Sequence, residues 1–116
     1  MDNHQCIFCK IIAGEIPGDR VYEDESALII RDVNPQAPCH LLVMPKEHMK
    51  DISACAGRGD ELIGKLFRAA AMAAAKEGLS EKGFRVVTNC GSDACQSVDH
   101  FHIHVLGGKQ LSERLG

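Results

Sequence analysis

The stretch that most constrains the fold is 99–106, in which three histidines alternate with three apolar residues. The histidines are His100, His102 and His104, and the apolar residues are Phe101, Ile103 and Val105. Successive side chains of a β-strand point to opposite faces, so the apolar set would face a core and the histidines would line the other face. A helix would spread both sets around its axis, which favours the strand. With a rise of ~3.3 Å per residue, one metal ion could join two neighbouring histidines but hardly all three, so the row has more than one role.

The remaining sequence predicts four more strands, a short N-terminal helix or turn, and one long helix. Apolar runs predict strands at 21–23, 26–32, 40–44 and 84–89, in addition to 100–106. The short helix falls at 6–12 and the long helix at 61–77, with Asp60 as its N-cap and Gly78 as its stop. The other connections are too short for parallel crossovers. We therefore predict an α+β fold with about five mainly antiparallel strands, one long helix and a short N-terminal helix, in a single domain 1–116.

The long helix has an apolar face and an uncharged centre. Its face consists of Leu62, Leu66, Phe67, Ala70, Ala73 and Ala74. No charge stands on any side of 69–75, and a helix that is apolar all round is usually buried on more than one side. In so small a protein, we expect another subunit to cover the second side.

Composition argues against several classes of function. The net charge is −3 and there is no basic run, so nothing favours a nucleic-acid partner. The longest apolar run, 69–75, is too short to cross a membrane, and the first residues lack a secretion signal. We therefore expect a cytoplasmic protein, in which Cys6-x-x-Cys9 is a metal-binding or redox-active pair rather than a disulfide.

The histidine row and the loop before it suit phosphate chemistry. A neutral imidazole, with an ordinary pKa of ~6.5, can attack phosphorus near neutral pH and leave in a second step. In the loop, Gln96 and Ser97 supply side-chain donors close to Gly91. Two other interpretations remain open, namely a purely metal-binding strand, because His-x-His is also a ligand spacing, and a structural role for the row.

The run 100–106 resembles the His-φ-His-φ-His-φ-φ signature of the histidine triad superfamily. The resemblance covers nearly the whole chain and is to the Hint branch, zinc-binding bacterial type. The matching positions are Phe8, 10–12, 15–17, Asp32, 35–38, His40, Val43, 45–46, Asn89, 91–93, 96–98 and 106–108. It implies a homodimer whose two sheets join across the interface. It also implies binding of purine nucleoside monophosphates and hydrolysis of nucleoside phosphoramidates.

The resemblance also implies a role for each matching residue. His102 would take the nucleotidyl group, His104 would bind phosphate and shuttle a proton, Ser97 would assist the leaving amine, and His40 would support the nucleophile from beside it. Further positions would bind the rest of the nucleotide: Gln96 and Asn89 the phosphate and sugar oxygens, Asp32 the ribose, and Ile7, Phe8, Ile11, Ile30, Val33 and Leu42 the base. As alternatives, Asp32 could start a turn, Asn89 could end a strand, and the apolar set could be ordinary core.

A structural zinc ion is the expected cofactor. Cys6 and Cys9 are spaced to form half of a tetrahedral site. The resemblance supplies His48 and His100 as the other two ligands, which would leave His102 and His104 for phosphate. The alternative is a pair of buried or oxidisable thiols. Cys95 departs from the Hint pattern, because glycine is common at that position, and the tail 109–116 lacks the tryptophan of animal members.

We therefore expect an enzyme, a nucleoside phosphoramidase that forms a nucleotidyl-histidine intermediate at His102. Two alternatives use the same residues. One is hydrolysis of dinucleoside polyphosphates, against which the Gln96-Ser97 pair argues. The other is a nucleotide-binding regulatory or scaffold module whose catalysis is incidental.

Overall fold

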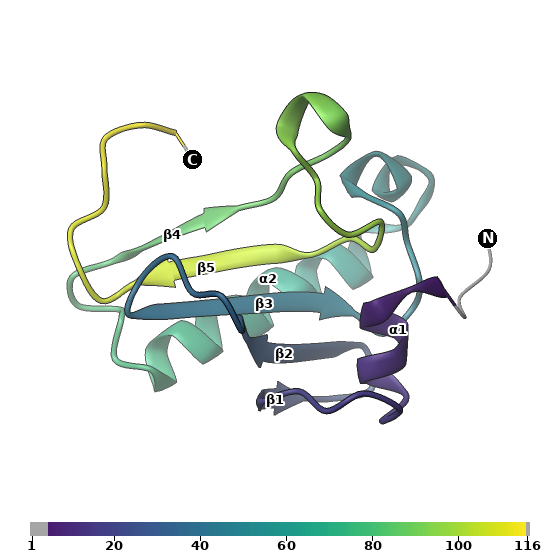
Figure 1. Cartoon of the computed structure of the whole chain (residues 1–116), viewed down its shortest axis with the longest axis horizontal. Helices are drawn as coiled ribbons and strands as arrows, with labels where there is room; N and C mark the ends of the chain where they lie inside the picture. Colours follow the sequence, from purple (N-terminus) through teal and green to yellow (C-terminus); the bar gives the residue numbers. More distant parts are fainter. Residues whose placement is uncertain (1–4, 116) are drawn as a thin grey trace.

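The computed structural model describes residues 5–115 and contains one five-stranded antiparallel sheet (Figure 1). The strand order is β1-β2-β3-β5-β4. The strands are β1 (Arg20–Glu23), β2 (Ala27–Arg31), β3 (Cys39–Pro45), β4 (Phe84–Val87) and β5 (Ile103–Gly107). All neighbouring pairs are antiparallel. The predicted α+β fold with about five antiparallel strands is thus confirmed.

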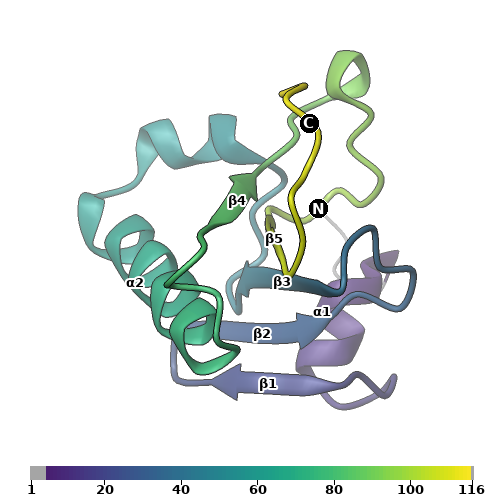
Figure 2. The same cartoon turned by 90° about the vertical axis from the view of Figure 1, so that its left-hand side faces the viewer.

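The two α-helices lie on opposite faces of the sheet (Figures 1 and 2). The short α1 (Ile7–Ile12) covers one face, and the long α2 (Asp60–Lys76) packs mainly over β1, β2 and β3 on the other. Two short 3-10 helices, η2 (Ile52–Gly57) and η3 (Ser92–Ala94), lie in the loops. No helix among the described residues is long and apolar enough to cross a membrane.

Strand β3 lies in the middle of the sheet, and every one of its residues is buried. Its side chains point alternately into two hydrophobic cores, one on each face of the sheet. Leu41 and Val43 belong to the core under α2, together with all four of that helix's buried alanines. Leu42 and Met44 alternate to the other face and pack with Phe8 of α1. Because side chains alternate along a strand, this register decides which face of neighbouring β5 meets which core.

Strand β5 is shorter than predicted, although the predicted alternation holds. It begins at Ile103, since the Phe101 N–H donates to the Met49 carbonyl at 2.6 Å instead of entering the sheet. The three alternating apolar residues nevertheless all lie in the core under α2. On the other face, the rings of His102 and His104 have centroids 5.1 Å apart.

Helix α2 corrects two details of the sequence prediction. Asp60 is its first residue rather than its cap; the cap is Gly59, which supplies no side-chain hydrogen bond. Phe67 is 48% exposed and does not face the core, and the buried residues are Leu66, Ala69, Ala70, Ala73 and Ala74. Gly78 ends the helix as predicted, with a φ of +80° that other residues rarely adopt.

Candidate active site and metal cluster

Two cysteines and two histidines from three separate segments meet at the N-terminal end of α1. Cys6 caps the helix and accepts a hydrogen bond from the Cys9 N–H at 3.2 Å, which turns both thiols to the same side. His48 follows β3, and His100 precedes β5. The Nδ1 atom of His100 lies 3.2 Å from Cys6 Sγ and 3.5 Å from Cys9 Sγ, and His48 Nδ1 lies 3.2 Å from Cys9 Sγ.

This cluster fits a zinc ion. Bond lengths of ~2.3 Å to sulfur and ~2.0–2.1 Å to nitrogen place sulfur and nitrogen about 3.6 Å apart in a tetrahedron. The four donor atoms all lie within 4.8 Å of one another, close to that size. The outer nitrogen of His100 lies 2.8 Å from the Pro45 carbonyl, so it carries the proton and leaves the lone pair of Nδ1 facing the sulfurs.

Charge balance supports the same assignment. Burial raises the pKa of the Cys9 thiol to about 12 and lowers the pKa of His100 to about 4, so neither residue readily carries a charge without a partner. Two thiolates and two neutral imidazoles around a divalent ion form a neutral complex, which suits a fully buried His100. The four donors would fill all positions of a tetrahedral zinc ion and leave none for water, as is typical of structural zinc sites.

His102 belongs to a different environment and presents a free nitrogen lone pair. Its Nδ1 lies 2.7 Å from the His100 carbonyl, which can only accept, so Nδ1 carries the proton. Its Nε2 therefore holds the lone pair, as a nucleophile requires. The ring is almost buried and meets Phe8 edge-on, with centroids 5.1 Å apart. Thr88 Oγ1 donates to the His102 carbonyl at 2.7 Å, which fixes the backbone at this position.

In His104 the proton is on Nε2 instead of Nδ1, and a chain of two hydrogen bonds fixes this position. The backbone N–H of Gln36 donates to His40 Nδ1 at 3.0 Å, so the proton of neutral His40 is on Nε2. That nitrogen lies 2.8 Å from His104 Nδ1, which therefore accepts. The remaining proton of His104 is on Nε2. One ring nitrogen of the pair thus offers a lone pair and the other an N–H.

His40 and His104, which share this hydrogen bond, are both neutral at pH 7. Burial lowers the pKa of His40, and the nearby Asp32 carboxylate only partly offsets this effect. The pKa of His104 falls to about 4, chiefly through burial and also through repulsion from His102 and His40. The hydrogen-bond chain described above is therefore the arrangement at physiological pH.

Asp32, His40 and His104 form a second cluster whose donor atoms lie within 4.8 Å of one another. A metal ion on His40 Nε2 would require the proton to move to Nδ1, where it would oppose the Gln36 N–H. The hydrogen bonding therefore favours a proton relay over a metal site here. Asp32 Oδ2 lies 3.4 Å from His40 Nε2, while its Oδ1 accepts the Asn34 N–H at 2.8 Å. Asp32 thus starts a turn through Oδ1 alone.

His40 does not lie where it was expected, beside the nucleophile. It bonds to His104, because in the β3–β5 ladder His40 stands opposite Leu106 and Leu42 stands opposite His104. His102 lies two residues before His104, just ahead of the start of β5, and the hydrogen bond of this ring goes to His104. His40 can therefore support the site only through His104.

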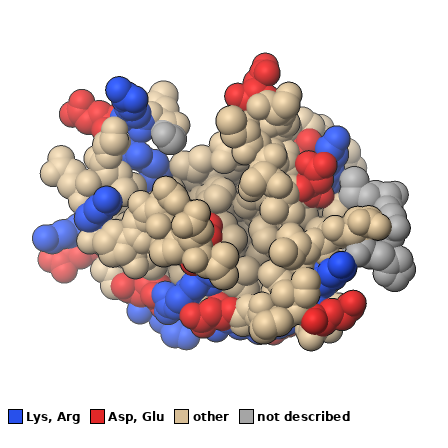
Figure 3. Space-filling model, in the orientation of Figure 1, with Lys and Arg blue, Asp and Glu red and all other residues tan. Residues whose placement is uncertain are grey.

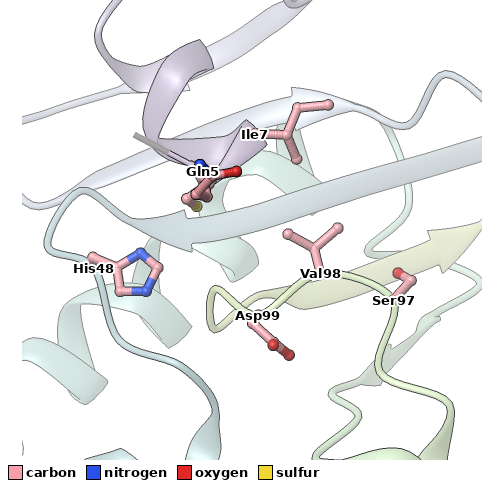
Figure 4. A pocket seen from close by; sticks show the side chains of 7 residues that line it. Gln5, Ile7, His48, Ser97, Val98 and Asp99 are labelled. Atoms are coloured by element: carbon pink, nitrogen blue, oxygen red, sulfur yellow. The ribbon is translucent and has the colours of Figure 1, made fainter. Parts of the chain in front are cut away.

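The predicted substrate-binding residues divide between two cavities and the core. Asn89, His40 and His104 line a cavity of about 440 Å³. Ser97 and Ile7 line another, of about 450 Å³, between the start of α1 and the 97–99 loop, with His48 across from Ser97 (Figure 4). Four of the apolar residues expected around a base are buried in the core under α1: Phe8, Ile11, Ile30 and Leu42. Val33, by contrast, is 98% exposed.

Gln96 organises the loop before β5. Its Oε1 accepts the Gly91 N–H at 2.9 Å, and its Nε2 donates to the carbonyls of Lys50 at 2.7 Å and Val98 at 2.9 Å. Both amide hydrogens are thus directed at backbone rather than at a ligand. Cys95 in the same loop has a φ of +58°, alone among the described non-glycine residues. This left-handed backbone explains why glycine suits the position.

Sequence reasoning missed the contribution of Gln36 to the relay. The group that acts is its backbone N–H, which every residue except proline possesses. The contact also depends on how loop 32–38 folds back over His40. No side-chain pattern could therefore have indicated it.

The fold and the site define a class: a small α+β protein in which an alternating histidine row contributes one ring to a Cys/His cluster and two neighbouring rings to a second, hydrogen-bonded centre. A family model described as HIT domain matches residues 13–111. The chain belongs to this histidine triad family, in its Hint-like branch.

Relatives of the chain agree with this assignment. A maize (Zea mays) protein named "14 kDa zinc-binding protein" is 46% identical over 97% of this chain and 88% of its own. The Arabidopsis thaliana protein named "Adenylylsulfatase HINT1" is 44% identical over 91% of this chain and 73% of its own. The solved structure of a HIT family hydrolase from Legionella pneumophila is 45% identical, with a TM-score of 0.93, and covers 97% of this chain and 100% of its own.

Proposed function

We propose that this protein hydrolyses purine nucleoside 5′-phosphoramidates through a nucleotidyl-histidine intermediate. The observation that carries the proposal is the opposed protonation of two adjacent rings, with a lone pair on His102 Nε2 and an N–H on His104 Nε2. A displacement at phosphorus needs both groups, one to attack and one to stabilise charge on the phosphoryl oxygens. Family membership supports the same chemistry, because relatives are named as hydrolases.

The reaction has two steps. His102 Nε2 attacks the α-phosphorus, a bond from phosphorus to the imidazole forms, and the bond to the amine breaks with its electron pair on the amine nitrogen. That nitrogen takes a proton from a water molecule by way of Ser97 and His104, and His104 ends neutral. The hydroxide so formed attacks the same phosphorus, and the imidazole leaves with the electron pair of the phosphorus–nitrogen bond. The products are a free amine and a nucleoside monophosphate.

The nucleoside has a defined position in this proposal. Asn89 shares its cavity with His104 and would bind phosphate oxygens, while Gln96 acts by holding the loop that bears Ser97. One Asp32 oxygen is committed to its turn, so the other would bind the ribose hydroxyls. The base would lie on exposed parts of Ile7 and Val33 above the buried apolar residues.

We also infer a structural zinc ion held by Cys6, Cys9, His48 and His100. When bound, it would tie the start of α1 to the segments that flank β3 and β5. It would thereby hold the His100 carbonyl that orients His102. The relatives named as zinc-binding proteins support this inference.

A homodimer is the proposed assembly, with β4 as the joining edge. Of the two edge strands, β1 carries charged Arg20 and Glu23, whereas β4 leaves Phe84 37% and Val86 40% exposed. Helix α2 packs mainly on β1 to β3, and β4 is not among its main contacts. Edge-to-edge pairing of two β4 strands would satisfy the unpaired backbone groups and cover these side chains.

The test uses His102→Ala with adenosine 5′-phosphoramidate. We expect turnover to fall at least 10³-fold, while AMP affinity stays within about threefold because the other ligand groups remain. Mass spectrometry of wild-type protein quenched during turnover should find a nucleotidyl group on His102. Near wild-type turnover in the variant, or a nucleotide attached elsewhere, would refute the mechanism.

A further inference from the structure

The nucleophile of the proposed reaction lies just outside the paired part of the sheet. On one side of β5 the ladder with β3 ends at the pair Val43–Ile103, and on the other side the ladder with β4 ends at Val87–His104. His102 precedes both pairs, although it is only 4% exposed. A buried residue beyond the end of a ladder needs other partners for its backbone polar groups. The position of His102 therefore depends on hydrogen bonds formed outside the ladders.

Three such bonds, all between described residues, hold the nucleophile and the two residues before it. The His102 ring donates from Nδ1 to the His100 carbonyl at 2.7 Å, and the Phe101 N–H donates to the Met49 carbonyl at 2.6 Å. The third bond holds the carbonyl of His102 itself, which accepts from Thr88 Oγ1 at 2.7 Å. Thr88 is the first residue after β4 and the only threonine of the chain. Of the three bonds, only this one reaches the nucleophile from a side chain elsewhere in the fold.

Ion pairs do not contribute to this position. Those found among the described residues all lie on segments other than 100–102. Figure 3 views the molecule from the α1 side, and its charged side chains stand mainly around the rim of the face that bears the histidine row. The nucleophile is thus oriented by neutral hydrogen bonds. Each of them matters for the rate, because a displacement of about 1 Å at a reacting group can cost about a hundredfold.

We propose that Thr88 is a positioning residue for the nucleophile, and that its hydroxyl keeps His102 Nε2 directed at the α-phosphorus. The inference rests on the proposed function, in which this nitrogen forms the bond to phosphorus. Thr88 acts through the backbone of His102 rather than on the substrate. Its neighbours Val87 and Asn89 line the cavity beside His104, and Thr88 does not, because side chains alternate along an extended chain. The hydroxyl therefore contributes to the rate of the chemical step and not to nucleotide affinity.

The kinetic test compares Thr88→Val with Thr88→Ser. Valine keeps the shape of threonine but cannot donate, so kcat for adenosine 5′-phosphoramidate should fall about tenfold while the dissociation constant of AMP changes less than about twofold. Serine keeps the hydroxyl and should restore kcat to within about threefold of wild type. Tyr22→Phe is the matched control, because it removes a hydroxyl bond of the same length, 2.7 Å to Asp24, at the β1 edge of the sheet, and should leave kcat unchanged. A wild-type kcat in Thr88→Val, or an equal fall in Thr88→Ser or Tyr22→Phe, would overturn the inference.

A second measurement does not depend on turnover. The His102 Nδ1–H should give a slowly exchanging imidazole signal in proton NMR, assigned by its loss in His102→Ala. Its exchange with water should be about tenfold faster in Thr88→Val, because the segment that carries both donor and acceptor is held less firmly, and unchanged in Thr88→Ser and Tyr22→Phe. If wild type hydrolyses no phosphoramidate and exchange still accelerates in Thr88→Val alone, the proposed function fails and the positioning by Thr88 stands. Equal exchange rates in wild type and Thr88→Val would show that Thr88 does not position this ring.

Discussion

The zinc assignment makes the sharpest prediction, through the substitution Cys9→Ser. Cys9 Sγ approaches both histidines of the cluster, at 3.2 Å and 3.5 Å, so its loss removes the ligand that joins them. A serine hydroxyl is a poor ligand for zinc and is not deprotonated at neutral pH. Cys55→Ser is the matched control, because Cys55 is also partly buried but belongs to neither cluster.

The expected effect follows from linkage between binding and folding. The four donors already surround one point in the folded chain and come from three segments that are far apart in the sequence, so zinc binds the folded state far better than the unfolded one. Free zinc at 1,000 times its dissociation constant adds about 4 kcal/mol to the free energy of unfolding. In a chain of 116 residues, where 1 kcal/mol shifts Tm by roughly 4 °C, this corresponds to about 15 °C.

The assay combines metal content with thermal unfolding. Wild type and Cys55→Ser should each hold one zinc per chain and lose about 15 °C in Tm when a strong chelator is added. Cys9→Ser should hold much less zinc, and its Tm should lie near that of chelated wild type. Wild-type protein that unfolds at the same temperature with and without chelator, and contains no stoichiometric metal, would refute the reasoning.

Three further predictions concern the loop, the relay and pH. Cys95→Gly should raise the free energy of unfolding by about 0.5–1 kcal/mol relative to Cys95→Ala in urea titrations, because only glycine adopts a φ of +58° without strain; equal values would contradict this. His40→Gln keeps an N–H donor for His104 and His40→Met does not, so the Met variant should lose about tenfold more kcat; equal loss would remove the relay. The pKa of His104 is depressed to about 4, so the unfolded chain binds more protons between pH 4 and 6.5. Stability should therefore fall by about 1 kcal/mol from pH 7 to pH 5, after discounting for partial exposure, and less in His104→Asn.

The arrangement of faces and ligands could be read from the sequence because it depends on local periodicity. Alternation places Phe101 and His102 on opposite sides whether or not the segment enters the sheet. For this reason the prediction survives the late start of β5 at Ile103. The Cys/His cluster gathers as expected, since Cys6 and Cys9 lie at the start of the short α1, and His48 and His100 lie in the segments that follow β3 and precede β5. In contrast, Phe67 was predicted to face the core and is exposed. Helical spacing shows which residues share a face of the helix, but it does not show how much of that face the sheet covers.

The relay could not be read from the sequence, because it depends on register and on backbone. Whether His40 meets His102 or His104 depends on one ladder alignment, and a shift of two residues would exchange the two partners. Which nitrogen of His104 carries the proton depends in turn on the Gln36 N–H, two contacts away. If that N–H pointed elsewhere, His40 could donate through either nitrogen, and His104 could present a lone pair to the phosphate instead of a proton. The chemistry of the centre is thus decided by a loop amide outside the signature, so proteins that share the histidine row can differ in proton transfer according to how this loop is folded.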